Sequence, residues 1–219
     1  MKKRKKKILP LLVLSVSVIG TILGGTYAYY ASVSDVQNQM ITKGSEVFLR
    51  ELFNKDDYWV PGETKEKAVS FGNQSDLDQV IRFKVTEKWY DNKGTPANLS
   101  DDTVWTPVGT YSPPPVVINW TSEVTGGTWV KIGDWYYYTK VFASGSKSSP
   151  TLTPDVISSV TFSPSISNAG PGAVDDFSDK RYSLLVEMET LDVNTDMTKE
   201  AWHMTFLESG SNLTWSVSP

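Results

Sequence analysis

Residues 79–89 read QVIRFKVTEKW, and this stretch decides the fold class of the chain. Its residues alternate between two faces, which is the period-two pattern of a half-buried β-strand. One face is mainly apolar and aromatic: Ile81, Phe83, Val85, Glu87 and Trp89. The other is mainly polar: Val80, Arg82, Lys84, Thr86 and Lys88. We therefore expect a strand whose aromatic and aliphatic face points inward.

Short segments rich in Val, Ile, Thr, Trp and Tyr flank this stretch, separated by clusters of Gly, Pro, Asn, Asp and Ser. We expect further strands at residues 68–71, 116–120, 128–131, 134–142, 156–162 and 181–191, and a short tail at 213–217. The segments between 116 and 142 are expected to form a meander, with tight turns at Gly126-Gly127 and Gly133-Asp134. Residues 46–53 fit a strand or a short helix, because their apolar positions match neither period. The pattern is typical of an all-β sandwich or barrel.

The composition excludes several kinds of chemistry. The chain has 219 residues and no cysteine, which rules out disulfides, thiolate zinc sites, iron–sulfur clusters and a cysteine nucleophile. A single histidine rules out any multi-histidine metal site. Six of the 21 basic residues lie in positions 2–7, so the rest of the chain carries 15 basic against 25 acidic residues, a net charge of −10. This surface argues against nucleic acid as a partner.

Residues 1–28 have the organisation of a signal peptide: a basic start, an apolar run of about sixteen residues, and small residues before a cleavage site. Thr26 and Ala28 supply those small residues, and Tyr30 follows in the cleavage region. The apolar run is short for a spanning helix, which needs about 20 residues. We therefore expect export, with signal peptidase as the partner during export and membrane contact only through this segment before cleavage; an uncleaved anchor is the alternative.

The string GGTYAYYASVSDVQNQMITKG (residues 24–44) resembles the cleavage region of substrates of the SipW-type alternate signal peptidase. The matching residues are Gly24, Gly25, Thr26, Ala28, Tyr30, Asp35, Asn38 and Gly44. Residues 59–85, 128–142 and 182–194 then follow the order of strand and turn units in the TasA/camelysin (CalY) family of exported Gram-positive proteins, the last followed by an Ala-Trp element. The segment TLDVN departs from the family's more usual Gln-Ala ending.

The resemblance implies an all-β, jelly-roll-like antiparallel β-sandwich preceded by an N-terminal signal helix. Its parts would be a signal peptide (1–28), an extended N-terminal segment (29–45) and a single β-sandwich domain (46–219). It also implies a non-enzymatic secreted or cell-surface protein of the extracellular matrix or biofilm, without a cofactor, whose partners are copies of itself or other matrix and cell-wall components. Camelysin relatives have been labelled metallo-endopeptidases, which makes an exported metallo-endopeptidase the alternative.

The residues give that alternative little support. His203 is the sole histidine and belongs to no HExxH motif, so we expect it to be structural or exposed. Asp192, Asn194 and Asp196 occupy positions 1, 3 and 5 of a calcium-loop pattern and are weak metal candidates. The pattern then fails, because Met197 stands where glycine is needed and His203 where the bidentate Glu belongs. We expect the acid pairs at 56–57, 101–102 and 175–176 to be solvated turn residues, and we expect no catalytic, cofactor or metal site.

The aromatic run Trp135, Tyr136, Tyr137 and Tyr138 is the remaining candidate surface. Alternation places Trp135 and Tyr137 on one face and Tyr136 and Tyr138 on the other, so half of the run is expected to face outward. An outward pair would stack on a wall glycan or contact a partner, although a cross-strand ladder is the simpler interpretation. A cell-wall glycan-binding module is therefore a further alternative.

The leading hypothesis is a fibre subunit that assembles by N-terminal strand exchange. Residues 29–44 carry few charges and suit an extended conformation, and cleavage would free them to add to an open sheet edge of the next subunit. Head-to-tail addition does not close on itself and gives filaments.

Overall fold

Strand β3 (Gln79–Asp91) confirms the strand expected at residues 79–89 and its inward face, since Ile81 and Phe83 are fully buried. The computed structural model describes residues 46–53, 61–92, 99–164, 166, 175, 177 and 180–219. The expected signal peptide, its cleavage region at Thr26, Ala28 and Tyr30, and the segment 29–45 lie outside these residues.

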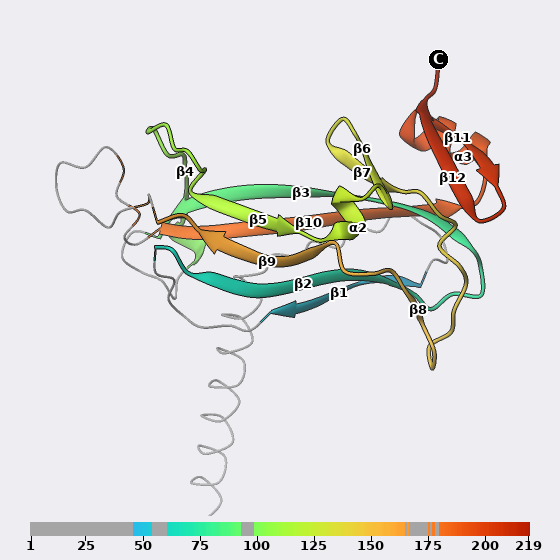
Figure 1. Cartoon of the computed structure of the whole chain (residues 1–219), viewed down its shortest axis with the longest axis horizontal. Helices are drawn as coiled ribbons and strands as arrows, with labels where there is room; N and C mark the ends of the chain where they lie inside the picture. The colour runs from blue at the N-terminus through green and yellow to red at the C-terminus, as the bar shows by residue number, and fades with distance from the viewer. Residues whose placement is uncertain are drawn as a thin grey trace, which may run out of the picture. The chain divides into compact units, whose positions relative to one another are not determined.

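Two antiparallel sheets make up most of the described chain (Figure 1). The first has the order β1 (Val47–Phe53), β2 (Thr64–Asn73), β9 (Ile157–Phe162), β5 (Val116–Trp120), with β8 (Thr151–Leu152) on β2. The second has the order β10 (Lys180–Asp192), β3, β7 (Trp135–Tyr138), β6 (Trp129–Ile132), with β4 (Thr103–Trp105) on β3. A hairpin of β11 (Met204–Ser209) and β12 (Asn212–Val217) forms a third, two-stranded sheet. The helices are η1 (Leu99–Asp101), α2 (Ser122–Thr125) and α3 (Thr195–Trp202).

The chain passes from one large sheet to the other after β2, β4, β5, β7 and β9. This repeated crossing is the connectivity of a jelly roll, in which strands consecutive in the sequence often lie in opposite sheets and face each other across the core. The fold is therefore the all-β, jelly-roll-like antiparallel sandwich that the sequence predicts.

Aromatic side chains from both sheets fill the core between them. The ring centroids of Phe71 and Phe83 lie 5.2 Å apart, and those of Phe71 and Trp129 lie 5.5 Å apart. Phe83 also packs on Trp120 at 6.3 Å, so β2, β3, β5 and β6 meet at one cluster. Tilted and edge-on ring pairs at these distances are favourable, and burial of such large apolar surfaces is the main stabilising contribution.

Two expectations need comment. Residues 46–53, which fitted either a strand or a helix, form strand β1. The expected meander of three strands is wrong: β6 and β7 do form a hairpin, with Gly133 at positive φ in its turn, but β5 pairs with β9 in the other sheet. The segment between β5 and β6 contains α2, and Gly126 caps this helix instead of turning a hairpin.

The described residues divide into two compact units. The smaller contains residues 87–92, 99–105 and 180–185, and the larger contains the remainder. In the smaller unit Trp89 packs on Trp105 at 6.1 Å and on Tyr182 at 5.1 Å. Arg181 pairs with Asp102 at 2.6 Å, so Asp102 is an ion-pair partner and not the solvated turn residue expected.

Candidate functional site

The aromatic run of β7 divides between the two faces of its sheet as alternation predicts. Tyr136 stacks on Phe83 in the sandwich core at 4.9 Å, and Tyr138 packs beside Trp129 at 4.8 Å. Tyr137 points to the opposite face, yet it is only 2% exposed. The run is therefore not the surface patch that the sequence suggested. The pKa of Tyr138 is raised above its ordinary value by burial and, to a lesser degree, by Glu123.

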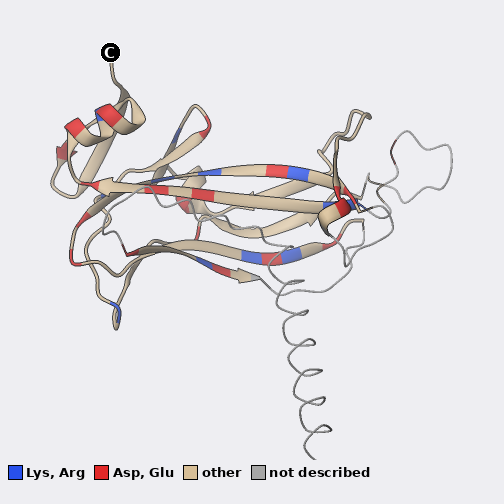
Figure 2. Ribbon diagram, turned by 180° about the vertical axis from the view of Figure 1, so that it is seen from behind, with Lys and Arg blue, Asp and Glu red and all other residues tan. Residues whose placement is uncertain are grey.

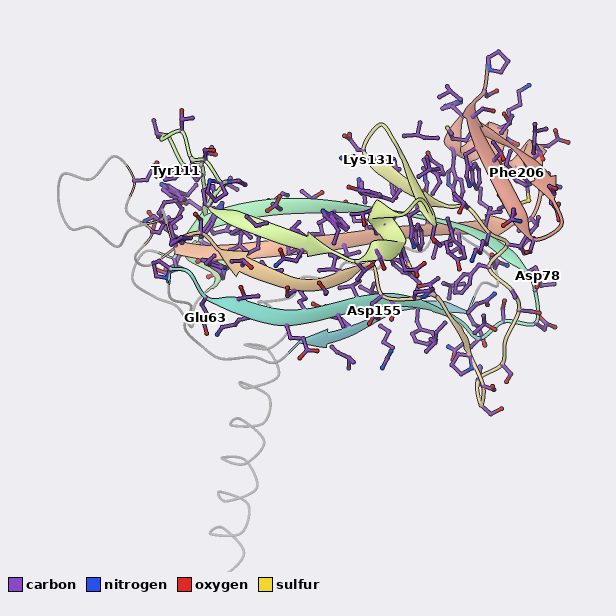
Figure 3. The ribbon with its side chains drawn as sticks, in the orientation of Figure 1. Glu63, Asp78, Tyr111, Lys131, Asp155 and Phe206 are labelled. Carbon is purple, nitrogen blue, oxygen red and sulfur yellow. The ribbon has the colours of Figure 1, made fainter. Side chains whose placement is uncertain are left out.

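The outer face of β7 is covered by the C-terminal cap, which we define as α3, β11 and β12 (residues 195–217). Phe206 belongs to this cap (Figure 3). One apolar cluster joins the cap to the sheet: Val80, Tyr137, Leu191, Trp202, Met204, Phe206, Leu213 and Trp215. Hydrogen bonds fix the position, because Trp215 Nε1 donates to the Tyr138 carbonyl at 2.8 Å and the Leu213 N–H donates to the Thr139 carbonyl at 2.8 Å.

Arg82 occupies an aromatic cage beneath the cap and is 8% exposed. Its Nε and Nη2 donate to Glu189 Oε2 at 3.0 and 2.6 Å, and Nη1 donates to the Tyr137 hydroxyl at 3.0 Å. The guanidinium lies 4.1 Å from the Trp135 ring centroid and 4.6 Å from that of Trp202. A buried charge that is ion-paired, hydrogen-bonded and stacked in this way anchors the cap to the sheet. The sequence pattern does not predict this burial, because alternation places Arg82 on the polar face of its strand.

The weak metal candidates begin a helix in the structure. The Asn194 side chain accepts hydrogen bonds from the N–H groups of Asp196 at 2.9 Å and Met197 at 3.1 Å, which is the N-cap arrangement for α3. Asp192 instead accepts a hydrogen bond from Gln79 Nε2 at 3.0 Å. Within the described ranges, no three His, Cys, Asp or Glu side chains gather as a metal site would require.

His203 ends the same helix. It adopts the left-handed conformation with φ of 56°, and its N–H bonds to the Thr198 carbonyl as the C-cap. Its own carbonyl accepts from the Ser218 N–H at 2.9 Å, which ties the end of the chain to the cap. The exposed residue has the structural role that the sequence predicted for it.

Asp175 holds the loop that leads to β5. Its carboxylate accepts from the N–H groups of Val108 at 2.9 Å and Gly109 at 2.6 Å, and from the Tyr111 hydroxyl at 2.6 Å (Figure 3 labels Tyr111). The hydrogen bond to Asp175, with burial and the nearby negative charge, raises the pKa of Tyr111 to about 12. Burial alone would raise the pKa of Asp175, but the three donated hydrogen bonds outweigh it and lower the pKa. Asp175 therefore holds the 108–111 loop through hydrogen bonds and is not the solvated turn residue that the sequence predicts.

The sheet edges remain as sites for a partner. Among the described strands, β1 and β5 end the first sheet and β10 and β6 end the second, each with one neighbour along its sheet. An edge strand presents unpaired backbone N–H and C=O groups, which an added strand can satisfy. Charged residues of both signs are interspersed along the strands (Figure 2), and several of them form ion pairs between neighbouring strands.

No helix in the described part of the chain is long and apolar enough to cross a bilayer. Comparison of the chain with protein-family models, with curated proteins and with solved structures finds no match.

Proposed function

We propose that this chain is an exported structural protein of the cell surface or extracellular matrix, which assembles with further copies of itself by strand addition. The observation that carries the proposal is a sandwich in which each end strand has one neighbour among the described strands, preceded in the chain by residues 29–45. A backbone edge pairs with an added strand without any dedicated side-chain chemistry. The proposal needs no cofactor, and its partners are copies of the chain or other matrix and wall components.

The residues that the sequence suggested for other functions have structural roles within the described fold. His203 ends a helix, Asn194 begins one, and Tyr137 lies under the cap. These contacts support a role in which the sandwich is a rigid block and its backbone edges form the contacts between subunits.

The test compares the mature protein beginning at Tyr29 with a version beginning at Ser45. We expect filaments by electron microscopy from the first and monomers from the second, because only the first retains the added strand. Matching thermal unfolding midpoints would establish that the shorter version folds. Two monomeric proteins under all conditions would contradict the proposal.

A further inference from the structure

We infer that the outer face of the first sheet binds an uncharged polysaccharide through polar side chains of three neighbouring strands, β5, β9 and β2 (Figure 1). These side chains form the polar patch: Thr64, Glu66, Asn119, Ser159 and Thr161. Such binding uses a sheet face instead of an edge and does not depend on assembly, so it goes beyond the proposed function. The whole patch belongs to the larger unit and is described within one compact body.

Strand pairing brings the polar patch together. Thr161 of β9 lies opposite Thr64 of β2, and Ser159 lies opposite Glu66 of the same strand. On the other side of β9, Asn119 of β5 lies opposite Ser159. Because residues two apart in a strand share a face, all of these side chains lie on one face of the sheet. At the ordinary strand spacing the patch extends over about 10 Å from β5 to β2.

The patch lies on the solvent side of the sheet. Val160, between Ser159 and Thr161 in β9, faces the sandwich core and is 1% exposed. Alternation therefore directs its two neighbours away from the core. Thr64 and Glu66 are exposed, and the other patch residues are half-buried. A ligand can therefore reach the patch without any change in the fold.

Hydrogen bonds hold the patch in a fixed arrangement. Asn119 Nδ2 donates to Ser159 Oγ and to Thr161 Oγ1, both at 2.9 Å. The hydroxyl oxygens of Thr161 and Thr64 lie 2.7 Å apart and share a further hydrogen bond. Asn119 thus uses both amide protons within the patch and keeps its Oδ1 as an acceptor. The Ser159 hydroxyl accepts from Asn119 and keeps its own proton for donation.

These groups match the hydroxyls of a sugar ring. Each sugar hydroxyl both donates and accepts, so neighbouring hydroxyls can donate to Asn119 Oδ1 and accept from Ser159. The exposed Glu66 carboxylate is a further acceptor, and hydrogen bonds to an ionised group are about twice as strong as neutral ones. Side chains that are already held in place lose little conformational entropy when a ligand binds. The patch is therefore suited to hydrogen bonding with a polyol.

The charge of the surrounding surface favours an uncharged ligand. Residues 103–122 and 156–164, which contain β5 and β9, have no charged side chain. Glu66 is the single charge of the patch, and it is negative. A polymer that carries phosphate or carboxylate groups would be repelled. A protein partner would need a buried apolar centre, which these polar side chains do not provide. An uncharged polysaccharide meets neither obstacle.

Isothermal titration calorimetry of the mature protein, beginning at Tyr29, tests the inference. The uncharged probes are cellohexaose, laminarihexaose and N-acetylchitohexaose, and hexagalacturonate is the charged comparison. We expect at least one uncharged probe to bind, and we expect no binding of hexagalacturonate, because its carboxylates would face Glu66. The uncharged probe that binds most tightly is then titrated into the variants.

Substitutions in the patch should weaken that binding. Asn119→Ala removes an acceptor and releases the two hydroxyls that its amide holds, so the Kd should rise about tenfold. Glu66→Ala removes the carboxylate acceptor and should raise the Kd about fivefold to tenfold. Because Glu66 is exposed, the melting temperature of this variant should not change, which separates lost binding from lost folding. Glu66→Gln retains an acceptor and should recover part of the affinity.

The matched control is Thr205→Ala. Thr205 and Ser216 form the same kind of hydroxyl pair between β11 and β12, with their oxygens 3.0 Å apart, outside the patch. The Kd of this variant should equal that of the unsubstituted protein.

Each remaining outcome overturns the inference. Absence of binding by every uncharged probe, or equal binding of hexagalacturonate, would overturn the choice of ligand. An equal loss in Thr205→Ala, or no loss in Glu66→Ala, would overturn the choice of surface. Filament formation tests the proposed function separately, because the substitutions change side chains of a sheet face and leave the backbone edges intact.

Discussion

Replacing Arg82 by methionine should reveal how strongly the C-terminal cap is anchored. The substitution removes the ion pair with Glu189, whose side chain is 19% exposed, and leaves that carboxylate without its partner. Breaking a buried pair by removing one member costs about 3 to 5 kcal/mol, and the partial exposure of Glu189 favours the lower end. Methionine retains part of the packing between the two tryptophans. We therefore expect the free energy of unfolding to fall by about 3 to 4 kcal/mol.

Urea unfolding followed by tryptophan fluorescence measures this loss. With a slope of about 2 kcal/mol per molar urea, the midpoint should fall by roughly 1.5 to 2 M. Lys131→Met is the matched control, because Lys131 lies on the exposed β6–β7 hairpin with its ammonium 5.3 Å from the Tyr136 ring (Figure 3). Loss of that exposed cation–π contact should cost less than about 1 kcal/mol.

Two further variants separate the contributions at the cage. Arg82→Lys keeps the charge and loses the forked hydrogen bonds, so its loss should be intermediate, about 1 to 2 kcal/mol. Combining Arg82→Met with Glu189→Leu removes the orphaned carboxylate and should recover about 1 to 2 kcal/mol of the single-variant loss. A loss below about 1 kcal/mol for Arg82→Met, or no recovery in the double variant, would refute the reasoning.

Four other substitutions test local features. Gly72→Ala would place a Cβ against the Phe48 ring, so we expect a loss of about 1 to 3 kcal/mol in urea unfolding, partly relieved by adding Phe48→Leu. The pKa of Tyr111 is about 12 in the folded protein and 10.0 in the unfolded chain, so stability should fall as pH rises across this window. The melting temperature of Tyr111→Phe should therefore fall less steeply with rising alkaline pH than that of the unsubstituted protein. Because folding lowers the pKa of Asp175, its carboxylate stabilises the folded protein at pH values above the unfolded pKa near 3.8, and this stabilisation is lost as pH falls through the folded pKa. Asp175→Asn should remove this part of the loss of stability in acid. Asn194→Ala should cost about 1 kcal/mol through loss of the helix cap, and added Ca²⁺ should leave the melting temperature of both proteins unchanged.

Alternation identified the sandwich core because one face of each long strand meets the opposite sheet. Ile81 and Phe83 follow the two-residue period and are fully buried. The same rule failed for Arg82 and Tyr137, because it treats a strand as having one buried face. Here the C-terminal cap, far later in the chain than either residue, covers the second face. Local periodicity contains no information about such a distant partner.

The glycine turn signals predicted one hairpin correctly and another incorrectly. Gly133 is in the β6–β7 hairpin, where its positive φ suits a tight turn. Gly126-Gly127 carries the same local signal, yet the chain there ends α2 on its way between sheets. A glycine pair indicates that the backbone turns, but tertiary packing determines which sheet the next strand joins. Asp175 was missed for the same reason, because its three hydrogen-bond donors lie more than 60 residues earlier in the chain.

The C-terminal cap also sets the order in which the chain can complete its folding. The Trp215 indole N–H donates to the carbonyl of Tyr138, 77 positions earlier in the chain. A polypeptide made from its N-terminus therefore holds the outer face of its second sheet uncovered until the C-terminal cap has been synthesised. A chain interrupted before Trp215 retains an exposed apolar face that chaperones and proteases recognise.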